Sequence, residues 1–182
     1  LTFNSLDGNN YQGFTFGTGS ITQYIIERER LTQFNEFLTS AGINLQLVAK
    51  DVDGERDIYV KYKSGETAKF FNVASKGTRA LALFYRWLID SNKIKLMLID
   101  EFDAYYHHEL SKAVLAQIRD SGIQTIVTTH NTSVMSNDLL RPDCYFILED
   151  NKMKSIAEST NKELRKAHNI EKMYRAGAFN DE

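Results

Sequence analysis

The chain has 182 residues, 42% of them hydrophobic and 25% charged, and its formal net charge is -2. This length can bury the hydrophobic core of one ordinary domain, and the near-neutral charge predicts neither a nucleic-acid nor a membrane partner. No apolar stretch reaches the roughly 18 residues of a membrane span, and a single cysteine cannot form an internal disulfide, which favours a reducing, cytoplasmic setting.

The first forty residues predict a strand-and-turn segment followed by one helix. Residues 1–19 are rich in Gly, Asn and Thr, with aromatic residues between them. Ser20 is a candidate N-cap for the helix, and Gly42 is the expected stop. Apolar residues recur between them at helical spacing and predict one buried face. These residues are Tyr24, Leu31, Phe34 and Leu38.

Residues 45–71 predict a small antiparallel meander. Ile58 and Val60 alternate with polar residues, as in a strand with one buried face. Asp-Gly at 53–54 and Ser-Gly at 64–65 supply the turns. The pattern changes after this segment, so we divide the chain into residues 1–71 and residues 72–182.

The second part alternates between helices and short apolar runs. Helices are predicted at about 77–91 and 109–121, and buried strands at about 94–99, 125–129 and 144–148. Cys144 lies in the third strand, where a buried thiol is expected. Strand, helix and strand in this order predict a right-handed crossover and a parallel sheet. The tail, residues 161–176, predicts a charged helix.

The predicted fold class is therefore α/β, with a parallel sheet flanked by helices. Ligands of such sheets bind beyond the carboxyl ends of the strands. Asp100, Glu101 and Asp103 follow the first strand, and His130 follows the second. An apolar strand ending in Asp-Glu is a Walker B pattern, in which the first carboxylate holds Mg²⁺ and the second polarises the attacking water. His130 could then hydrogen-bond a terminal phosphate.

An ordinary structural role is the alternative for each of these residues. Asp-Glu could simply open a helix, where the helix dipole favours acidic residues, and His130 could be a loop histidine. The segment Ala-Ser-Lys-Gly-Thr-Arg at 74–79 opens an amphipathic helix, whose free N–H groups can bind an anion. Ser75 adds a hydroxyl group and Gly77 permits close approach, although Ser75 could equally be an ordinary N-cap.

Taken in order, these motifs resemble the carboxy-terminal lobe of an ABC-type P-loop ATPase. The similar group is the SMC/RecF/OLD-like ATPases rather than the membrane transporters. The resemblance covers about 72–149: Ser-x-Gly-Thr-Arg opens a helix, Leu-Met-Leu-Ile-Asp-Glu follows, and Thr-Thr-His-Asn comes after the next strand. Residues 169–179 are also similar to tails of bacterial ATP-binding proteins linked to abortive infection and phage defence.

The resemblance implies a site for ATP and Mg²⁺ that two subunits share. Asp100 would hold the magnesium, Glu101 would be the catalytic base, and His130 would be the switch histidine. The D-loop, from Asp103 to His107, would run along the dimer interface. The signature motif would bind the γ-phosphate of ATP held by the partner subunit, and it would contain Ser75, Lys76, Gly77 and Thr78. Self-association or a second ATPase subunit is therefore expected, with nucleic acid or a partner nuclease as further candidates.

The sequence departs from the family pattern in three ways. The signature reads Ser-Lys-Gly-Thr instead of Leu-Ser-Gly-Gly-Gln, and His107 stands where the D-loop usually has Asp, as in the OLD-like branch. No Gly-x-x-x-x-Gly-Lys-Ser/Thr occurs, because no Lys follows the glycines at 13, 17 and 19. The chain also begins with Leu1. We therefore expect the natural protein to carry this phosphate loop upstream, residues 1–71 to include the end of an inserted arm and a lobe edge, and the isolated chain to be inactive.

Two other classes of function remain open. The first is a metal-dependent hydrolase or nuclease that uses Asp100, Glu101, Asp103 and His107 without ATP. The second is a non-catalytic interaction domain that has lost the phosphate loop. His-His-Glu at 107–109 is interpreted as a helix-start cluster, because adjacent helical histidines point apart. Tyr-Tyr at 105–106 favours packing over base stacking, and the basic tail favours a solvated face over a nucleic-acid patch.

Overall fold

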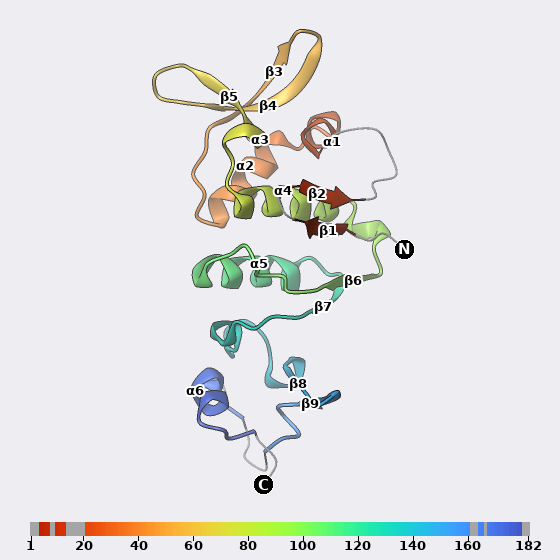
Figure 1. Cartoon of the computed structure of the whole chain (residues 1–182), viewed down its shortest axis with the longest axis vertical. Helices are drawn as coiled ribbons and strands as arrows, with labels where there is room; N and C mark the ends of the chain where they lie inside the picture. Colours follow the sequence, from red (N-terminus) through yellow and green to blue (C-terminus); the bar gives the residue numbers. More distant parts are fainter. Residues whose placement is uncertain (1–3, 8–9, 14–20, 161–163, 166, 180–182) are drawn as a thin grey trace. The chain divides into compact units, whose positions relative to one another are not determined.

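The computed structural model describes residues 4–7, 10–13, 21–160, 164–165 and 167–179. It divides into two compact units, Leu1–Lys93 and Ile94–Glu182, and each is described by itself (Figure 1). The change of pattern at residue 71 falls inside the first unit. The candidate N-cap Ser20 and the glycines at 17 and 19 lie outside the described residues.

The first unit begins with a hairpin and two short helices rather than the single helix predicted. Strands β1 (Asn4–Asp7) and β2 (Asn10–Gly13) pair antiparallel, α1 spans Ile21–Glu27, and α2 spans Leu31–Ser40. The break lies at Glu29, whose φ of 54° is left-handed and ends the first helix. The sequence Glu-Arg-Glu-Arg at 27–30 has no apolar side chain to bury, so tertiary packing does not sustain a helix through it.

The predicted stop of the second helix at Gly42 is confirmed. The N–H of Gly42 donates to the Thr39 carbonyl at 2.9 Å, and the N–H of Ile43 donates to the Leu38 carbonyl at 2.8 Å. This pair of bonds is a Schellman closure, which needs a left-handed residue. Glycine supplies it with a φ of 80° and no Cβ to strain.

The predicted meander is present as strands β3 (Leu47–Val52), β4 (Glu55–Lys61) and β5 (Thr67–Lys69), paired antiparallel in this order. Asp53 and Gly54 form the two-residue turn between β3 and β4, with φ values of 54° and 81°. The prediction that strands extend to residue 71 is wrong. Phe70 is fully buried and begins a short helix, α3 (Phe70–Val73).

Helix α4 (Lys76–Ile89) carries the core of the first unit, and the 3-10 turn η1 (Ser91–Lys93) follows it. Leu81 on α4 is fully buried. The ring centroid of Phe34 on α2 lies 5.1 Å from that of Tyr85 on α4 and 5.6 Å from that of Phe70 on α3. Aromatic rings bury large apolar areas, so this cluster joins the three helices.

A polar cluster around Asp90 links α1 to the end of α4. The Asp90 carboxylate accepts a hydrogen bond from the Tyr24 hydroxyl at 2.6 Å. It also pairs with Arg86 at 3.1 Å and with Lys93 at 3.0 Å. The Arg86 guanidinium lies 3.7 Å from the centre of the Tyr24 ring, so the four side chains form one connected group.

The second unit contains the predicted parallel pair, and the α/β fold class is confirmed. Strands β6 (Leu96–Ile99) and β7 (Gln124–Val127) pair with Ile99 opposite Val127, and α5 (His108–Asp120) connects them. The expectation that these strands are buried is wrong for one of their faces. Met97 is buried, but Leu98 is 69% exposed and Ile126 is 56% exposed, because alternate side chains point to opposite faces and only one face is covered.

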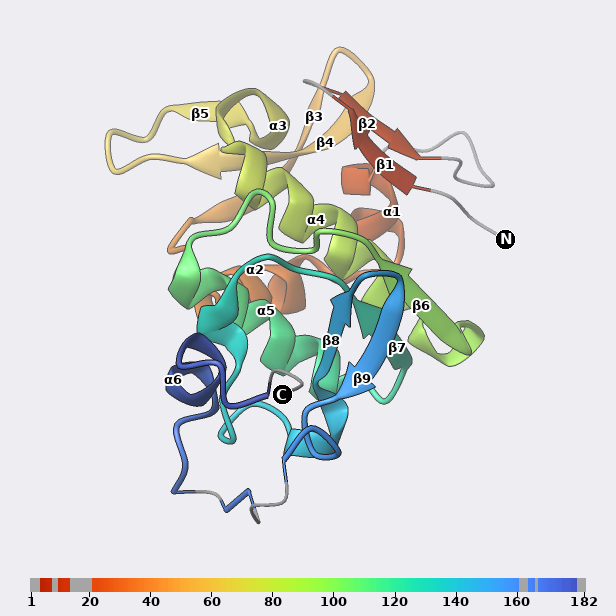
Figure 2. The ribbon, with the colours of Figure 1, turned by 60° about the horizontal axis from the view of Figure 1, so that its bottom comes forward.

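The third predicted strand forms a separate hairpin. Strand β8 (Phe146–Glu149) pairs antiparallel with β9 (Lys152–Ser155) (Figure 2). In the described part of the chain, β8 does not join the β6–β7 pair. The expectation of a buried thiol is also wrong. Cys144 is exposed and ends the 3-10 turn η3 (Pro142–Cys144), which Pro142 initiates before the strand begins.

The predicted tail helix is shorter than expected. Of the described tail residues, only those of α6 (Ile170–Arg175) are α-helical, and Asn169 caps this helix by accepting from the Lys172 N–H at 2.8 Å. Ile170 packs into a buried cluster with Tyr145, Ile156 and Phe179, which fixes α6 to the second unit. A helix long and apolar enough to span a membrane does not occur within the described ranges.

Candidate functional site

The carboxyl ends of β6 and β7 continue side by side into two loops. The Thr128 N–H donates to the Ile99 carbonyl at 3.0 Å, and the Phe102 N–H donates to the Thr128 carbonyl at 3.1 Å. The parallel pairing therefore extends beyond the last strand residues. The prediction that the loops after these two strands meet at one edge of the sheet is confirmed.

Thr128 holds the two acidic residues of the first loop. Its hydroxyl accepts from the Glu101 N–H at 2.8 Å and donates to the Asp100 carboxylate. One hydroxyl group thus fixes both the backbone of Glu101 and the side chain of Asp100. Sequence reasoning missed this role, although a hydroxyl residue two positions before His130 was visible in the Thr-Thr-His-Asn motif.

Thr129 performs a similar function for Asp103. The Thr129 hydroxyl donates to the Asp103 carboxylate at 2.6 Å and accepts from the Asn131 N–H at 2.9 Å. The two consecutive threonines therefore connect the loop after β6 to the loop after β7. The two residues that precede His130 are therefore both bonded to the acidic loop.

Glu101 and His130 face each other across this junction. The His130 Nε2 lies 3.8 Å from a Glu101 carboxylate oxygen, which is within ion-pair range and too long for a direct hydrogen bond. The His130 side chain is 94% exposed and the Glu101 side chain is 62% exposed. Glu101 has a left-handed φ of 44°, an uncommon backbone for a residue with a side chain. Such strain is concentrated at functional sites, and here it accompanies a carboxylate that is available to a ligand.

A surface pocket of about 340 Å³ lies at this edge. Its lining includes Glu101, Asp103 and His130 from the predicted set, together with residues that sequence reasoning did not assign to the site. Asp100 is not among the lining residues, and its carboxylate accepts from the Thr128 hydroxyl. The structure thus brings four predicted residues to one edge and places three of them at the pocket surface.

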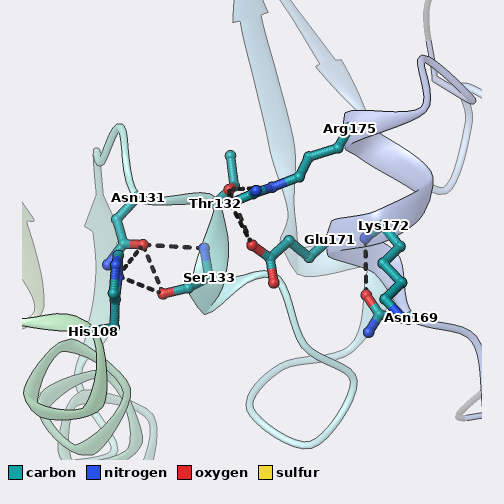
Figure 3. Close-up of polar contacts among 8 residues, drawn as sticks. All are labelled: His108, Asn131, Thr132, Ser133, Asn169, Glu171, Lys172 and Arg175. Atoms are coloured by element: carbon teal, nitrogen blue, oxygen red, sulfur yellow. Dashed lines mark hydrogen bonds and ion pairs between the residues drawn. The ribbon is translucent and has the colours of Figure 1, made fainter.

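His108 is one of the additional lining residues. Its Nδ1 lies 3.1 Å from the Asn131 side-chain oxygen and 3.2 Å from the Ser133 hydroxyl (Figure 3). Asn131 also accepts from the N–H of Ser133 at 3.1 Å and caps the 3-10 turn η2 (Thr132–Val134). The start of α5 is therefore joined to the turn that follows His130.

Arg175 of α6 also lines the pocket. Two of its guanidinium nitrogens lie 3.1 and 3.3 Å from the Thr132 hydroxyl, and one of them pairs with Glu171 at 2.8 Å (Figure 3). Thr132 follows His130 by two residues. The tail, predicted to be a solvated helical face, thus places one cation beside the pocket.

His107 lies outside this pocket-lining set. Its Nδ1 accepts from the Leu110 N–H at 3.4 Å, so His107 is the N-cap of α5, as expected of a helix-start cluster. Among the described residues there is no group of three His, Cys, Asp or Glu side chains arranged to hold a metal ion. Burial raises the pKa of the Tyr106 hydroxyl, which agrees with a packed rather than a base-stacking side chain.

The predicted signature residues belong to the first unit. Ser75 caps α4: its hydroxyl accepts from the Thr78 N–H at 3.1 Å and lies 2.8 Å from the Thr78 hydroxyl. Ser75 and Lys76 are exposed, whereas Gly77 and Thr78 are buried. Ser75 therefore serves as an ordinary N-cap, and its hydroxyl is engaged with Thr78.

The donor set at the edge of the sheet fits Mg²⁺. This ion is bound through one or two carboxylates, with water and substrate phosphates completing the octahedron, so it does not require a preformed cluster of three ligands. Asp100 is the carboxylate held in place by Thr128, and the exposed Glu101 stands next to it. Asp100 would hold the ion, which would neutralise phosphate charge at this edge.

Several SMC structures resemble this chain. The Smc head domains of Pyrococcus furiosus, bound to the C-terminal domain of ScpA, and of Pyrococcus yayanosii each share 24% identity over 57% of this chain, with a TM-score of 0.43. The chain spans 28% and 22% of those two chains. A structure described as "Structural biochemistry of ATP-driven dimerization and DNA stimulated activation of SMC ATPases" shares 16% identity, covers 90% of this chain and 99% of its own, and has a TM-score of 0.51. At this identity the likeness concerns the fold.

A family match covers most of the chain, although no curated protein sequence shows significant similarity to it. Residues 7–136 match the family described as "AAA domain, putative AbiEii toxin, Type IV TA system". Together with the SMC-like fold, this match confirms the predicted resemblance to ABC-type, SMC-like ATPases related to abortive-infection proteins. The matched residues are more than half of the 182 in the sequence, so the chain belongs to this AAA-domain family of nucleotide-binding ATPases.

Proposed function

We propose that this chain supplies the Walker B carboxylates and the switch histidine of a composite site that hydrolyses Mg-ATP. The observation that carries the proposal is the junction at the edge of β6 and β7, where Thr128 holds Asp100 and Glu101 faces His130. The phosphate-binding loop would come from a segment outside these 182 residues, since the sequence contains none.

Each residue has a role that follows from its chemistry. The exposed Glu101 carboxylate would accept a proton from the attacking water, which is the task of a general base. His130 would donate a hydrogen bond to the terminal phosphate and keep it in line with that water. Thr128 would maintain the spacing of these groups by holding the Asp100 carboxylate and the Glu101 backbone.

The second half of the proposal is that the site is shared between two subunits. Ser75 would contact the γ-phosphate of ATP held by the partner subunit, and its place as an exposed residue at the start of α4 is suited to this contact. Lys76, Gly77 and Thr78 would form the rest of the signature, with the buried Gly77 and Thr78 shaping the helix start. Asp103 to His107 would run along the dimer interface. The SMC ATPase with the similar fold is described as undergoing ATP-driven dimerization, and we propose the same class of behaviour here.

The cellular setting is part of the same proposal. The matched family is described as a putative AbiEii toxin of a type IV TA system, which supports a role in phage defence. We propose the cytoplasm as the place of this role. DNA maintenance is the second setting, since the similar SMC ATPase is described as stimulated by DNA. ATP binding would bring two copies together and hydrolysis would release them, so that a partner domain or nuclease could read the change.

A mixing experiment tests hydrolysis and sharing together. Steady-state ATP turnover is measured for the protein expressed from its natural coding sequence, for Ser75→Asp and for Glu101→Gln. Aspartate keeps the N-cap of α4 and places a negative charge against the partner's phosphate. Each variant alone should be inactive. An equal mixture should recover about a quarter of the wild-type rate, because half the dimers are mixed and each has one intact site.

The alternatives predict different results. A composite site is excluded if the mixture stays as inactive as its components while each variant alone is inactive. Wild-type protein that turns over no ATP but cleaves nucleic acid with Mg²⁺ would indicate the metal-dependent hydrolase. Wild-type protein that binds partners and has neither activity would indicate an interaction domain.

A further inference from the structure

The pocket beside Glu101 and His130 contains a cation that the proposed hydrolysis mechanism does not use. Arg175 reaches it from α6, forty-five residues after His130 in the sequence. Among the described residues that line the pocket, Arg175 is the only lysine or arginine. The other charged lining residues include the carboxylates of Glu101 and Asp103, which need a bound cation before they tolerate an anion nearby.

Arg175 is held in position by a packed helix rather than by a free tail. Ile170, at the first position of α6, is fully buried, and Phe179 after the helix is 2% exposed in the same cluster. Asn169 caps the amino-terminal end of the helix by accepting from the Lys172 N–H. The backbone that carries Arg175 is therefore anchored, while its side chain remains 66% exposed.

The guanidinium is satisfied by groups that an anion can replace or join. Glu171 accepts from one terminal nitrogen at 2.8 Å, and the Thr132 hydroxyl lies 3.1 and 3.3 Å from two nitrogens. Thr132 itself donates to Glu171 at 3.3 Å (Figure 3). Arginine has five donors in a planar fork that matches a phosphate group, so the present contacts leave this fork able to bind a second oxyanion.

We propose that Arg175 binds a phosphate group of the ligand in this pocket. To do so, its guanidinium would break the ion pair with the Glu171 carboxylate. The inference rests on the proposed nucleotide function of the pocket, and it assigns the terminal phosphate of a Mg²⁺-bound polyphosphate to Arg175. Without ligand, Arg175 pairs with Glu171 on its own helix. With ligand, the guanidinium turns to the phosphate and remains beside Thr132.

This exchange would couple α6 to the turn that contains His130. Thr132 contacts both Arg175 and Glu171, and its neighbour Asn131 is joined to His108 at the start of α5. A phosphate held by His130 on one side and Arg175 on the other would therefore connect the loop and the tail. The tail would then report whether the terminal phosphate is present.

The test measures binding of inorganic tripolyphosphate with Mg²⁺ to the 182-residue chain, followed by NMR of the Arg175 side chain and the His130 ring. This probe lacks the nucleoside, so it requires only the anion site. Arg175→Ala should weaken binding by roughly tenfold or more, since a charge-assisted phosphate contact is lost. Lys172→Ala is the matched control: it removes an exposed cation from the same helix, and it should change binding by less than about twofold.

Glu171→Gln gives the result that a purely structural role would not produce. It frees the guanidinium while keeping the shape of the side chain, so affinity should rise about threefold or more. The gain should vanish in the Arg175→Ala background, because Glu171 acts through Arg175. If the contacts between Arg175, Glu171 and Thr132 only hold α6 in place, Glu171→Gln and Arg175→Ala should each weaken binding of the probe. Arg175→Lys, which retains the charge but not the fork, should fall between wild type and alanine.

Two outcomes would overturn the proposal. One is equal binding of tripolyphosphate by wild type, Arg175→Ala and Lys172→Ala. The other is the absence of any NMR shift of the Arg175 side chain and the His130 ring in wild type at millimolar tripolyphosphate. Hydrogen exchange of α6 shows whether this helix stays folded in Arg175→Ala. If it does not, the affinity of Glu171→Gln for the probe decides whether Arg175 binds the phosphate. The mixing experiment with Ser75→Asp and Glu101→Gln is independent of these variants, so failure of this inference and failure of the ATPase proposal are separately visible.

Discussion

The Asp90 cluster of the first unit and the Glu101 pocket of the second each contain a carboxylate, but the two carboxylates differ in exposure and in the number of close partners. Asp90 is 18% exposed and meets Tyr24, Arg86 and Lys93 within 3.1 Å. Glu101 is 62% exposed, has a left-handed backbone, and has His130 as its ion-pair neighbour at 3.8 Å. A carboxylate with several close donors stabilises the fold, whereas one held by its backbone and exposed to solvent is available for chemistry.

The pKa of Asp90 reflects its partners. Burial alone raises the pKa, but the hydrogen bonds from Tyr24 and Lys93, with the charges of Lys93 and Arg86, outweigh burial and lower it below its ordinary value. The ionised form is therefore favoured in the folded protein. The cluster contributes stability that depends on this charge.

The largest stability effect is expected for Asp90→Asn. Asparagine retains the shape but loses the charge that three donors share, so the free energy of unfolding should fall by about 1.5–3 kcal/mol. Denaturant unfolding measures this loss. Asp120→Asn, at an exposed ion pair with Arg119, is the control and should leave the denaturation midpoint unchanged. Equal effects of the two changes would show that the Asp90 cluster contributes nothing particular.

The same cluster predicts a pH dependence. The pKa of Asp90 in the folded protein lies below the ordinary value of 3.8. The stability that ionised Asp90 contributes is therefore fully present above pH 3.8, and it is lost as the pH falls from 3.8 through the folded-state pKa. The difference in unfolding free energy between wild type and Asp90→Asn should therefore be constant from neutral pH to about 5 and shrink below about 4. A difference that persists unchanged at acidic pH would contradict the assignment.

Thr128→Val is expected to lower activity and leave stability almost unchanged. The change removes the hydroxyl that holds Asp100 and the Glu101 N–H, at a position exposed to solvent. The two hydrogen bonds lost together are worth about 1–3 kcal/mol, so ATP turnover should fall roughly tenfold or more, while the unfolding midpoint changes little. Thr125→Val, on β7 just before Thr128, removes a hydroxyl that bonds to the Ile123 carbonyl, and turnover should be retained.

The smallest effect is expected for Glu29→Gly. Glu29 has a φ of 54°, similar to that of Glu101, but it ends a helix and lines no described pocket. Glycine relieves the left-handed strain and adds freedom to the unfolded chain, so stability should increase by only about 0.5 kcal/mol. Thermal unfolding measures the change. A clear loss of stability would show that the Glu29 side chain is needed at the break.

Local sequence signals predicted the parts of the fold that local interactions determine. The Asp-Gly turn at 53–54, the stop at Gly42 and the parallel pair β6–β7 each follow from a short motif, and the structure contains all three. The break at Glu29 and the exposure of Cys144 were not predicted. Both depend on whether neighbouring elements offer an apolar surface, which periodicity along one segment does not reveal.

The residues of the candidate site also fall into those that a local motif predicted and those that it did not. Asp100, Glu101 and His130 were identified because they follow apolar strands, and the ends of parallel strands share an edge. Thr128 and Arg175 were not, because their roles depend on contacts between segments 27 or more residues apart. A charged tail gives no sequence signal that one arginine returns to the pocket.

The measurement that tests the account most directly compares Glu101→Gln with Glu109→Gln in the protein expressed from its natural coding sequence. Both replace an exposed glutamate, but Glu109 lies in the first turn of α5 and pairs with Lys112 outside the pocket. Glu101→Gln should retain ATP binding and lose about 10²–10⁴-fold in turnover, as for a general base, while Glu109→Gln should match wild type. Equal turnover by the two variants would contradict the assignment of Glu101 as the base of an ATPase.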